Sequence, residues 1–260
     1  MAEGQQTFWE HLDVLRGSIF KILAAVAIAG VVAFFFKEEL FSIVLAPASS
    51  DFIFYQWLGG VEPFKLHLVN TGLTEQFMAH LTVSMAAGLI CASPYVIYVL
   101  FHFVSPALYE NERRYGTRLL TSAYLMFVVG MLVNYLIIFP LTVRFLGNYQ
   151  VSVDVENMLT LQSYIGTMLT MTIVFGALFE IPVVCWLLAL FGLLRPEWMR
   201  AYRRHSIMVI LILSAIVTPT TDIFTLIIVS LPIWLLYELS IYVVAATVKK
   251  SNKEKSLTSS

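Results

Sequence analysis

Residues 81–118 read LTVSMAAGLICASPYVIYVLFHFVSPALYENERRYGTR, and this stretch decides the fold. An apolar run over residues 81–104 ends at a short polar connection, residues 105–118, and a second apolar run begins at Leu119. A run of about 18 or more apolar residues can cross a hydrocarbon core roughly 30 Å thick. The stretch therefore predicts two membrane-spanning helices joined by a short charged loop.

The composition of the whole chain supports a membrane protein. Of its 260 residues, 59% are apolar and 13% are charged, and the mean hydropathy is +0.81. A soluble domain usually has roughly 45–50% apolar and about 25% charged residues. We therefore predict an all-α integral membrane protein that lies in a lipid bilayer, and we expect no nucleic-acid partner.

Six apolar runs divide the chain and predict a single polytopic membrane domain over residues 1–248. The fourth run is long for one crossing, so we expect it to bend near Pro182. The fifth is short, because its twelve residues rise only about 18 Å as a helix. The polar tail, residues 249–260, is predicted to be disordered. An amphipathic helix at residues 8–17 precedes the crossings, which we place at residues 19–36, 81–104, 119–139, 164–194, 206–217 and 223–244.

The positive charges lie on alternate connections between these runs. Thirteen of the 16 Lys and Arg residues fall near the amino terminus, in residues 105–118, in residues 195–204 and in the tail. Cytoplasmic loops of membrane proteins are enriched in Lys and Arg. We therefore predict a multi-pass protein of the cytoplasmic (inner) cell membrane with both termini, and the loop 105–118, on the cytoplasmic side.

The sequence carries no catalytic signature. It contains no His-Glu-x-x-His, no Gly-x-Ser-x-Gly, no phosphate-binding glycine loop and no intramembrane pair of Asp residues. Cys91 and Cys185 both lie in apolar runs, without a Cys or His at metal-ligand spacing. We therefore predict that the protein is not an enzyme and that it holds neither a metal nor a cofactor.

Glu180 lies in the middle of the fourth run, in Phe179-Glu180-Ile181-Pro182. A charge at that depth costs about 2.5–3.5 kcal/mol on insertion scales, so such residues usually face a protein interior or a partner. Two interpretations remain open: a protonated carboxyl that is hydrogen-bonded to a neighbouring helix, or a docking point for another helix or a proton-linked site. Glu238, near the end of the sixth run, is interpreted as mostly structural.

The loop 105–118 carries Glu110 and Glu112, which would not share a face if the loop were helical. We therefore expect only one of them to be central. Glu112 either pairs with a neighbouring arginine in solvent, an interaction that is common and weak, or binds a cationic ligand.

The amino-terminal segment, residues 8–16, is predicted to be an amphipathic helix on the cytoplasmic face. On such a helix Glu10 and Val14 share a face, whereas Asp13 is turned about 100° from Val14. His11 is interpreted as interfacial rather than catalytic.

At these residues the chain resembles the TatC family, the polytopic core subunit of the twin-arginine protein translocase. The likeness covers residues 8–244 and rests on several separated motifs in a fixed order. They are His11-Leu12-x-x-Leu15-Arg16, Ala46-Pro47, Glu75-x-Phe77, Ser93-Pro94, Phe103 with Ser105-Pro106-Ala107-Leu108-Tyr109-x-x-Glu112-Arg113-Arg114, Phe139-Pro140, Phe179-Glu180-Ile181-Pro182, and Thr218-Pro219 followed by Asp222.

The resemblance implies a glove-like concave bundle of six helices with short fifth and sixth crossings. It implies a receptor for the Arg-Arg signal peptides of folded proteins, in a multimeric complex with TatA- and TatB-type single-span subunits that is driven by the proton-motive force. Glu112 matches the family's signal-binding glutamate, Phe103 matches an aromatic of the same surface, and Arg16 belongs to the amino-terminal motif. Structural roles are expected for Pro47, Pro94, Pro106, Pro182 and Asp222.

The chemistry of arginine agrees with this implied function. A carboxylate accepts two parallel hydrogen bonds from one guanidinium group, which the ammonium group of lysine cannot reproduce. The sequence departs from the family at Val14, where the family has glutamate, and we hypothesise that Glu10 or Asp13 supplies the second carboxylate. It also has Tyr98-Val99-Leu100-Phe101 where the family has Tyr-Gln-x-Trp.

A rival interpretation is a small-solute or ion transporter that uses Glu180 and Glu238 as a proton relay. It predicts solute flux through the purified chain alone. The chain has no internal repeat, whereas many transporters are built from duplicated halves. We therefore favour the translocase, with Glu180 as the point at which the single-span partners dock.

Overall fold

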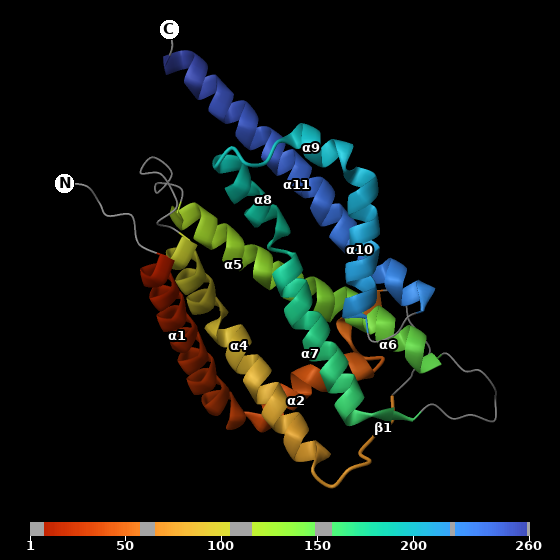
Figure 1. The fold of residues 1–260 in the computed structure, drawn as a ribbon. Helices are drawn as coiled ribbons and strands as arrows, with labels where there is room; N and C mark the ends of the chain where they lie inside the picture. Colours follow the sequence, from red (N-terminus) through yellow and green to blue (C-terminus); the bar gives the residue numbers. More distant parts are fainter. Residues whose placement is uncertain (1–7, 58–65, 105–115, 149–157, 219–221, 259–260) are drawn as a thin grey trace. The chain divides into compact units, whose positions relative to one another are not determined.

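The computed structural model describes residues 8–57, 66–104, 116–148, 158–218 and 222–258, which are almost entirely helical (Figure 1). The elements in chain order are α1 (Phe8–Phe34), α2 (Lys37–Leu45), the 3-10 turn η1 (Ala46–Ala48), α3 (Ile53–Trp57), β1 (Leu68–Val69), α4 (Glu75–Val104), α5 (Gly116–Val133), the π-helical turn η4 (Asn134–Ile138), α6 (Phe139–Asn148), β2 (Leu159–Thr160), α7 (Leu161–Leu178), α8 (Ile181–Leu190), α9 (Pro196–Ala201), α10 (Arg203–Val217) and α11 (Ile223–Thr258).

Five stretches among the described residues are long and apolar enough to cross a membrane. They are Leu12–Phe34, Glu75–Phe103, Arg118–Gly147, Leu161–Leu190 and Ile223–Lys249. The predicted fifth crossing corresponds to α10, whose 15 residues make it short, as expected. The five candidate spans and α10 overlap the six predicted segments.

Two helices are longer than the sequence predicted. Residues 8–17 do not form a separate helix, because α1 is continuous from Phe8 to Phe34. The helix α11 has 36 residues, so the sixth segment is not short, and it includes residues 249–258, which we expected to be disordered. No Gly or Pro follows Pro232 in this helix, so nothing in the sequence interrupts it. Lysines near a helix carboxyl terminus also interact favourably with its dipole.

The contacts of the chain divide it into two units, residues 1–42 with 77–124 and residues 43–76 with 125–260. In the first unit α1 and α4 lie side by side and run in opposite directions (Figure 1). They meet at two glycines: a Cβ on Gly88 would lie 2.4 Å from the backbone nitrogen of Gly30 and 2.8 Å from the carbonyl oxygen of Val26. Small residues allow helix backbones to approach closely in membranes. Only glycine fits this crossing.

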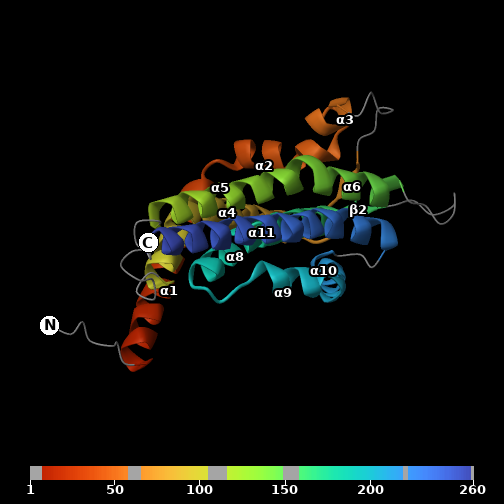
Figure 2. The same ribbon diagram turned by 90° about the horizontal axis from the view of Figure 1, so that it is seen from above.

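The second unit holds a pair of helices and a small parallel sheet. The helices α8 and α11 pack together through Ala189, Ile241 and Val244, and they lie side by side in both ribbon views (Figures 1 and 2). The strands β1 and β2 pair with Leu68 opposite Leu159. These contacts tie the connection before α4 to the start of α7.

Two irregular points interrupt the long helices of the second unit. The fourth apolar run breaks between α7 and α8, at Phe179 and Glu180, with Pro182 in the first turn of α8. The sequence predicted this bend, because proline has no N–H to continue the helical hydrogen bonds. The third run contains the π-helical turn η4, which the sequence did not predict.

Three tyrosine hydroxyls hold the turn at the end of α2 in the second unit. Tyr135 donates to the carbonyl oxygen of Ile43 at 2.8 Å, and Tyr164 donates to that of Val44 at 3.0 Å. The Tyr55 hydroxyl lies 3.2 Å from the carbonyl oxygen of Pro47 and 3.0 Å from that of Pro140. Pro47 is buried in this turn.

Replacing Tyr55 by Phe is expected to lower the free energy of unfolding by about 1–2 kcal/mol, because the buried carbonyls of Pro47 and Pro140 lose the single hydroxyl proton that they share. The side chain is only 1% exposed, and burial raises the pKa of Tyr55 from 10.0 to about 12. A raised pKa stabilises the folded state fully below pH 10, and this contribution is lost as the pH rises towards 12. Thermal unfolding in detergent measures the effect.

The matched control is Tyr242→Phe, because the Tyr242 side chain is 67% exposed. We expect this variant to unfold like the unmodified protein. Equal melting temperatures for the Tyr55→Phe variant and the unmodified protein would show that the buried hydroxyl does not stabilise the turn.

Candidate functional site

One end of the first unit brings together most of the predicted binding residues. From the Gly30–Gly88 crossing, Asp13 lies 17 residues back along α1 and His102 lies 14 residues forward along α4. At 1.5 Å per residue these distances are about 26 Å and 21 Å. Because the two helices are antiparallel, both segments lie at the same end of the pair (Figure 1). We call residues 12–16 with residues 98–103 the α1/α4 end.

The amino-terminal part of the α1/α4 end presents exposed polar side chains. Asp13, Val14 and Arg16 are all exposed. The guanidinium carbon of Arg16 lies 5.8 Å from the centre of the Phe20 ring, one turn further along α1. No hydrogen bond or ion pair joins the Asp13 carboxylate to another described residue. Glu10 belongs to α1, but its side chain lies outside the described part.

Aromatic side chains line the part of the α1/α4 end that α4 contributes. Tyr98 and His102 are exposed and stack with their ring centres 6.2 Å apart. Phe103 is half-buried in the last turn. A Cβ on Gly116 would lie 3.3 Å from the Phe101 ring, so the end of α4 contacts the start of α5. This contact brings Phe101 and Gly116, which lie on either side of residues 105–115 in the sequence, close together.

Two of the predicted site residues lie between these ends. Glu112 and Pro106 belong to residues 105–115, which are outside the described residues. The sequence singled out Phe103, but it gave no reason to pair Tyr98 with His102. The only available signal was their spacing of four residues, which places two side chains on one helical face.

Glu180 occupies the break between α7 and α8 in the second unit. Its backbone carbonyl accepts hydrogen bonds from Val183 and Val184, at 3.0 and 2.9 Å, which start α8. Its side chain is half-buried, and Oε1 is buried without a hydrogen-bond partner among the described residues. A buried polar atom left unpaired costs about 1–3 kcal/mol. The break therefore leaves a buried acceptor unpaired in a side chain that is half-buried as a whole.

Close packing between α5 and α7 holds this break in place. A Cβ on Gly130 would lie 2.6 Å from the carbonyl oxygen of Phe175 and 2.8 Å from Cβ of Phe179. A Cβ on Gly176 would lie 2.8 Å from the Phe127 ring. The last turn of α7 is thus fixed against the neighbouring helix, immediately before Glu180.

A second buried polar group lies on the π-helical turn. Asn134 is fully buried, and its Nδ2 donates to Oγ1 of Thr172 on α7 at 2.9 Å. Its Oδ1 has no partner among the described residues. Sequence reasoning missed Asn134, although an amide inside an apolar run is a signal of the same kind as Glu180.

The other predicted residues have structural surroundings. Asp222 caps α11, because its Oδ1 accepts a hydrogen bond from the backbone N–H of Thr225 at 2.7 Å. Pro94 lies inside α4 with its side chain exposed. Glu238 forms an ion pair with Arg203 at 2.7 Å, which gives it a partner other than Glu180. Among the described residues, no group of three or more His, Cys, Asp or Glu side chains is placed to hold a metal.

Known proteins resemble this chain over nearly its full length. The family model described as Sec-independent protein translocase protein (TatC) matches residues 10–232. Sec-independent protein translocase protein TatC of Koribacter versatilis is 33% identical over 96% of this chain and 88% of that protein. The TatC of Aquifex aeolicus is 31% identical over 95% of this chain and 98% of its own length.

A solved structure resembles the fold equally well. A crystal structure of the twin arginine translocase receptor TatC has a TM-score of 0.75 and 30% sequence identity. The likeness covers 92% of this chain and 99% of that one. The family model, the related sequences and the solved structure are thus all TatC proteins.

Proposed function

The chain belongs to the TatC family of Sec-independent protein translocase proteins, which are membrane transport components and not enzymes, and on this premise we propose that it binds Arg-Arg signal peptides at the α1/α4 end. In this proposal both termini and the loop 105–118 face the cytoplasm. Single-span TatA- and TatB-type subunits dock at Glu180, and the proton-motive force drives export of the folded cargo.

The observation that carries the receptor proposal is the geometry of the α1/α4 end. The exposed carboxylate of Asp13 and the stacked rings of Tyr98 and His102 belong to the same end of one antiparallel helix pair. The Phe101–Gly116 contact belongs to the same unit, and Glu112 lies between these two residues in the sequence. Carboxylates bind guanidinium groups through paired hydrogen bonds, and aromatic faces stack on them. Both kinds of group that recognise arginine are therefore supplied by the same unit.

The ion pair of Glu238 argues against the rival transporter. A proton relay between Glu180 and Glu238 requires Glu238 to exchange protons with a neighbour, whereas its Oε2 is bound to Arg203 at 2.7 Å. The carboxylate is thus held by a partner on α10 and not by Glu180. The buried oxygen of Glu180 therefore supports docking of a partner more than transfer of a proton.

An Arg-Arg signal peptide is expected to bind the detergent-purified protein, and its Lys-Lys counterpart is expected to bind at least tenfold more weakly. Losing a paired charged hydrogen bond costs about 1.5–3 kcal/mol, or roughly 10- to 150-fold in affinity. The Glu112→Ala variant should lose this preference by a similar factor. Fluorescence titration with labelled peptides measures both effects.

Glu197→Ala is the matched control, because Glu197 lies in the first turn of α9, in the second unit. Equal binding of the two peptides to the unmodified protein would refute the receptor proposal.

The same titration tests whether Glu10 or Asp13 supplies the second carboxylate. If binding persists unchanged after both Glu10→Gln and Asp13→Asn, neither residue replaces the family glutamate at Val14.

A further inference from the structure

The short helix α3 presents two large apolar side chains away from the protein. Trp57 is 86% exposed and Ile53 is 65% exposed, and their spacing of four residues places them on one helical face. Phe54 and Tyr55, between them in the sequence, are buried. In Figure 2 α3 lies at one side of the second unit, beyond α6 and away from α11. The exposed face of α3 therefore covers no part of the helical core.

The buried side chains of this region hold α3 firmly against the third apolar run. The Tyr55 hydroxyl lies 3.0 Å from the carbonyl oxygen of Pro140. The ring of Phe52, the residue before α3, meets the ring of Tyr135 edge to face, with centres 5.3 Å apart. Trp57 follows Tyr55 by two residues, which is less than one helical turn of about 5.4 Å. The level of Trp57 along the spans is thus set by Tyr55 and Pro140.

Two apolar runs show where this level lies in a bilayer. The run of residues 119–139 rises about 31 Å as a helix, which matches a hydrocarbon core roughly 30 Å thick. Its last residue, Phe139, contacts Tyr164, the first residue of the next run, with ring centres 5.2 Å apart. Both runs therefore reach their limit at one level. Pro140 is the next residue, so α3 lies beside this limit.

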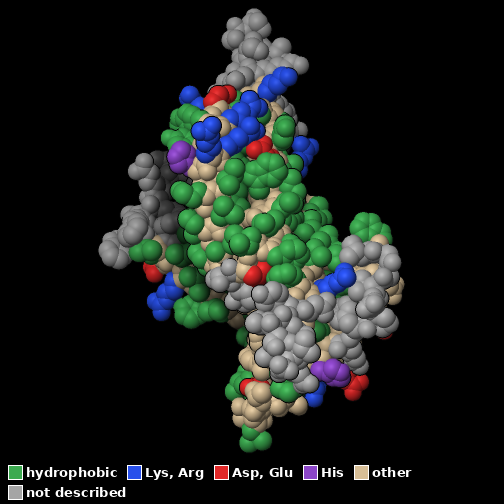
Figure 3. Space-filling view, turned by 90° about the vertical axis from the view of Figure 1, so that its right-hand side faces the viewer, with side chains coloured by type: hydrophobic (Ala, Val, Ile, Leu, Met, Phe, Trp, Pro, Cys, Tyr) green, Lys and Arg blue, Asp and Glu red, His purple; other side chains and the backbone are tan. Residues whose placement is uncertain are grey.

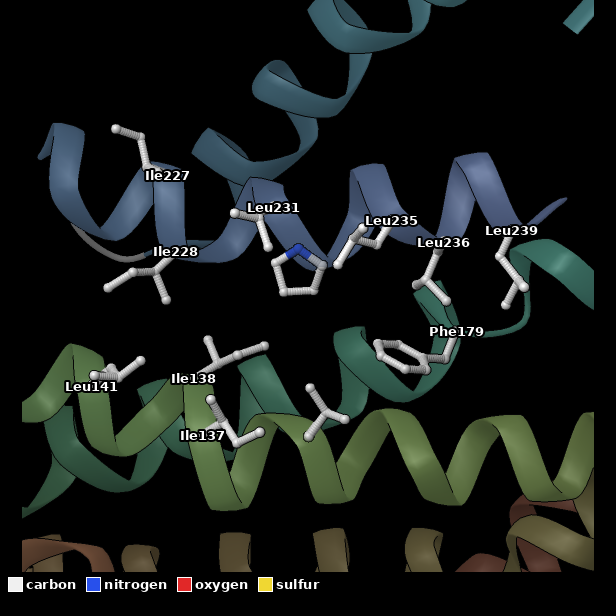
Figure 4. A pocket seen from close by; sticks show the side chains of 12 residues that line it. Ile137, Ile138, Leu141, Phe179, Ile227, Ile228, Leu231, Leu235, Leu236 and Leu239 are labelled. Atoms are coloured by element: carbon white, nitrogen blue, oxygen red, sulfur yellow. The ribbon is translucent and has the colours of Figure 1, made fainter. Parts of the chain in front are cut away.

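The side chains of the third run change character at the same level. Ile137, Ile138 and Leu141 line a groove that faces α11, and all the side chains of this groove are apolar (Figure 4). Thr142 and Arg144 follow directly and introduce polar groups. This change from apolar to polar side chains is expected where a span leaves the hydrocarbon core.

The other limit of the hydrophobic surface is marked by charge. Figure 3 shows Lys and Arg side chains gathered at one end of a broad area of hydrophobic side chains. Exposed arginines of this kind, Arg195 and Arg200, flank or belong to α9, which follows α8 in the chain. The α3 end of the second unit lies at the opposite end of the α7–α8 run, where Tyr164 is located.

The size of the exposed face decides between a membrane and a protein as its partner. A fully buried aromatic side chain covers about 150–250 Å², so Trp57 and Ile53 together offer roughly 400 Å² at most. A stable protein interface buries about 800 Å² on each partner. Tryptophan is enriched at the boundary of a membrane with water, where its ring meets acyl chains and its N–H meets polar groups. The exposed face of α3 fits this boundary.

We propose that α3 is an interfacial anchor, whose Trp57 and Ile53 side chains insert between the phospholipid headgroups and the first methylenes of the leaflet at this end of the spans. Because Tyr55 ties α3 to Pro140, the anchor fixes the depth of the third span in the bilayer. Movement of that span along the membrane normal would carry Trp57 out of the boundary layer. This inference depends neither on signal-peptide binding nor on docking at Glu180.

The test is the fluorescence of Trp57 in the full chain, reconstituted into phosphatidylcholine vesicles. The other four tryptophans are first replaced by Phe; they are Trp9, Trp186, Trp198 and Trp234. Lipids brominated close to the headgroup should quench Trp57 about twofold or more as strongly as lipids brominated near the chain end, because interfacial side chains lie within about 5–10 Å of the headgroup boundary. Aqueous iodide should quench it weakly.

The matched control moves the single tryptophan to position 73, by Leu73→Trp with Trp57→Phe. Leu73 belongs to the same unit, is 101% exposed and stands among polar residues before α4. Iodide should quench this tryptophan more strongly than brominated lipids do. In the chain that retains Trp57, Ile53→Asp places a charge in the boundary layer and should increase iodide quenching without changing the melting temperature, because residue 53 is exposed.

The proposal is overturned if iodide quenches Trp57 as strongly as it quenches a tryptophan at position 73. It is also overturned if brominated lipids quench Trp57 most strongly from the chain end, since the side chain would then lie deep in the core. Absence of quenching by either reagent would show that protein covers Trp57, as in contact with a second copy of the chain, and would equally refute the anchor.

Discussion

Replacing Glu180 by Ala is expected to lower export of Arg-Arg cargo by about tenfold or more, while peptide binding remains unchanged. The side chain is half-buried and its Oε1 has no hydrogen-bond partner among the described residues, so a docking helix gains that hydrogen bond if the carboxyl turns towards it on docking. Such a bond is worth about 1–3 kcal/mol, which corresponds to roughly 5- to 150-fold in the population of the assembled complex. Export into membrane vesicles and co-purification of the single-span subunits measure the effect.

The variants at Glu180 also distinguish hydrogen bonding from ionisation. Gln keeps the size of the side chain and one carbonyl oxygen but has no charge. Export by Glu180→Gln close to that of the unmodified protein would identify Glu180 as a hydrogen-bonding anchor. Export as low as that of Glu180→Ala would require an ionisable group at this position. In either case Glu197→Ala should export normally, and loss of peptide binding in a Glu180 variant would contradict separate binding and docking sites.

The apolar pattern predicted the segments of this fold because the membrane imposes a length on them. Pro182 marked the break between α7 and α8, since a residue without an N–H cannot continue the helix. The short α10 followed from the count of apolar residues. The continuity of α1 through Arg16 was not predictable, because a change from polar to apolar residues does not by itself end a helix.

The sequence predicted the candidate site less completely than the fold. Glu180 stood out because a carboxylate in an apolar run is costly, and the structure places it at a helix break with a buried oxygen. No local pattern in residues 134–138 indicates the π-helical turn. Asp13 and the Tyr98–His102 pair belong to the same end of one helix pair because α1 and α4 cross at Gly30 and Gly88. Such contacts depend on distant residues.

Replacing Gly88 by Leu is expected to destabilise the α1–α4 pair by about 3 kcal/mol or more, the upper range for overpacking. The first atom of the new side chain would already lie 2.4 Å from the nitrogen of Gly30 and 2.6 Å from its Cα. Backbone atoms cannot rotate away as a flexible side chain does, so the two helices must separate. Among residues 12–34 of α1, Gly30 is the one buried residue, so little other contact holds this helix in place. Thermal unfolding in detergent measures the loss.

Gly17 provides the control position for a Gly→Ala change, because a Cβ there would have no atom within 4 Å. Gly17→Ala should stabilise α1 by about 0.5–1 kcal/mol, since alanine is the better helix former, whereas Gly88→Ala should destabilise the pair despite the same gain. If Gly→Ala raises the stability at position 17 and lowers it at position 88, the effect of the crossing is separated from that of helix propensity.

Separation of α1 from α4 should also weaken Arg-Arg peptide binding, because Asp13 belongs to one helix and Tyr98 to the other. Stability and peptide affinity unchanged in Gly88→Leu would show that the crossing does not assemble the α1/α4 end.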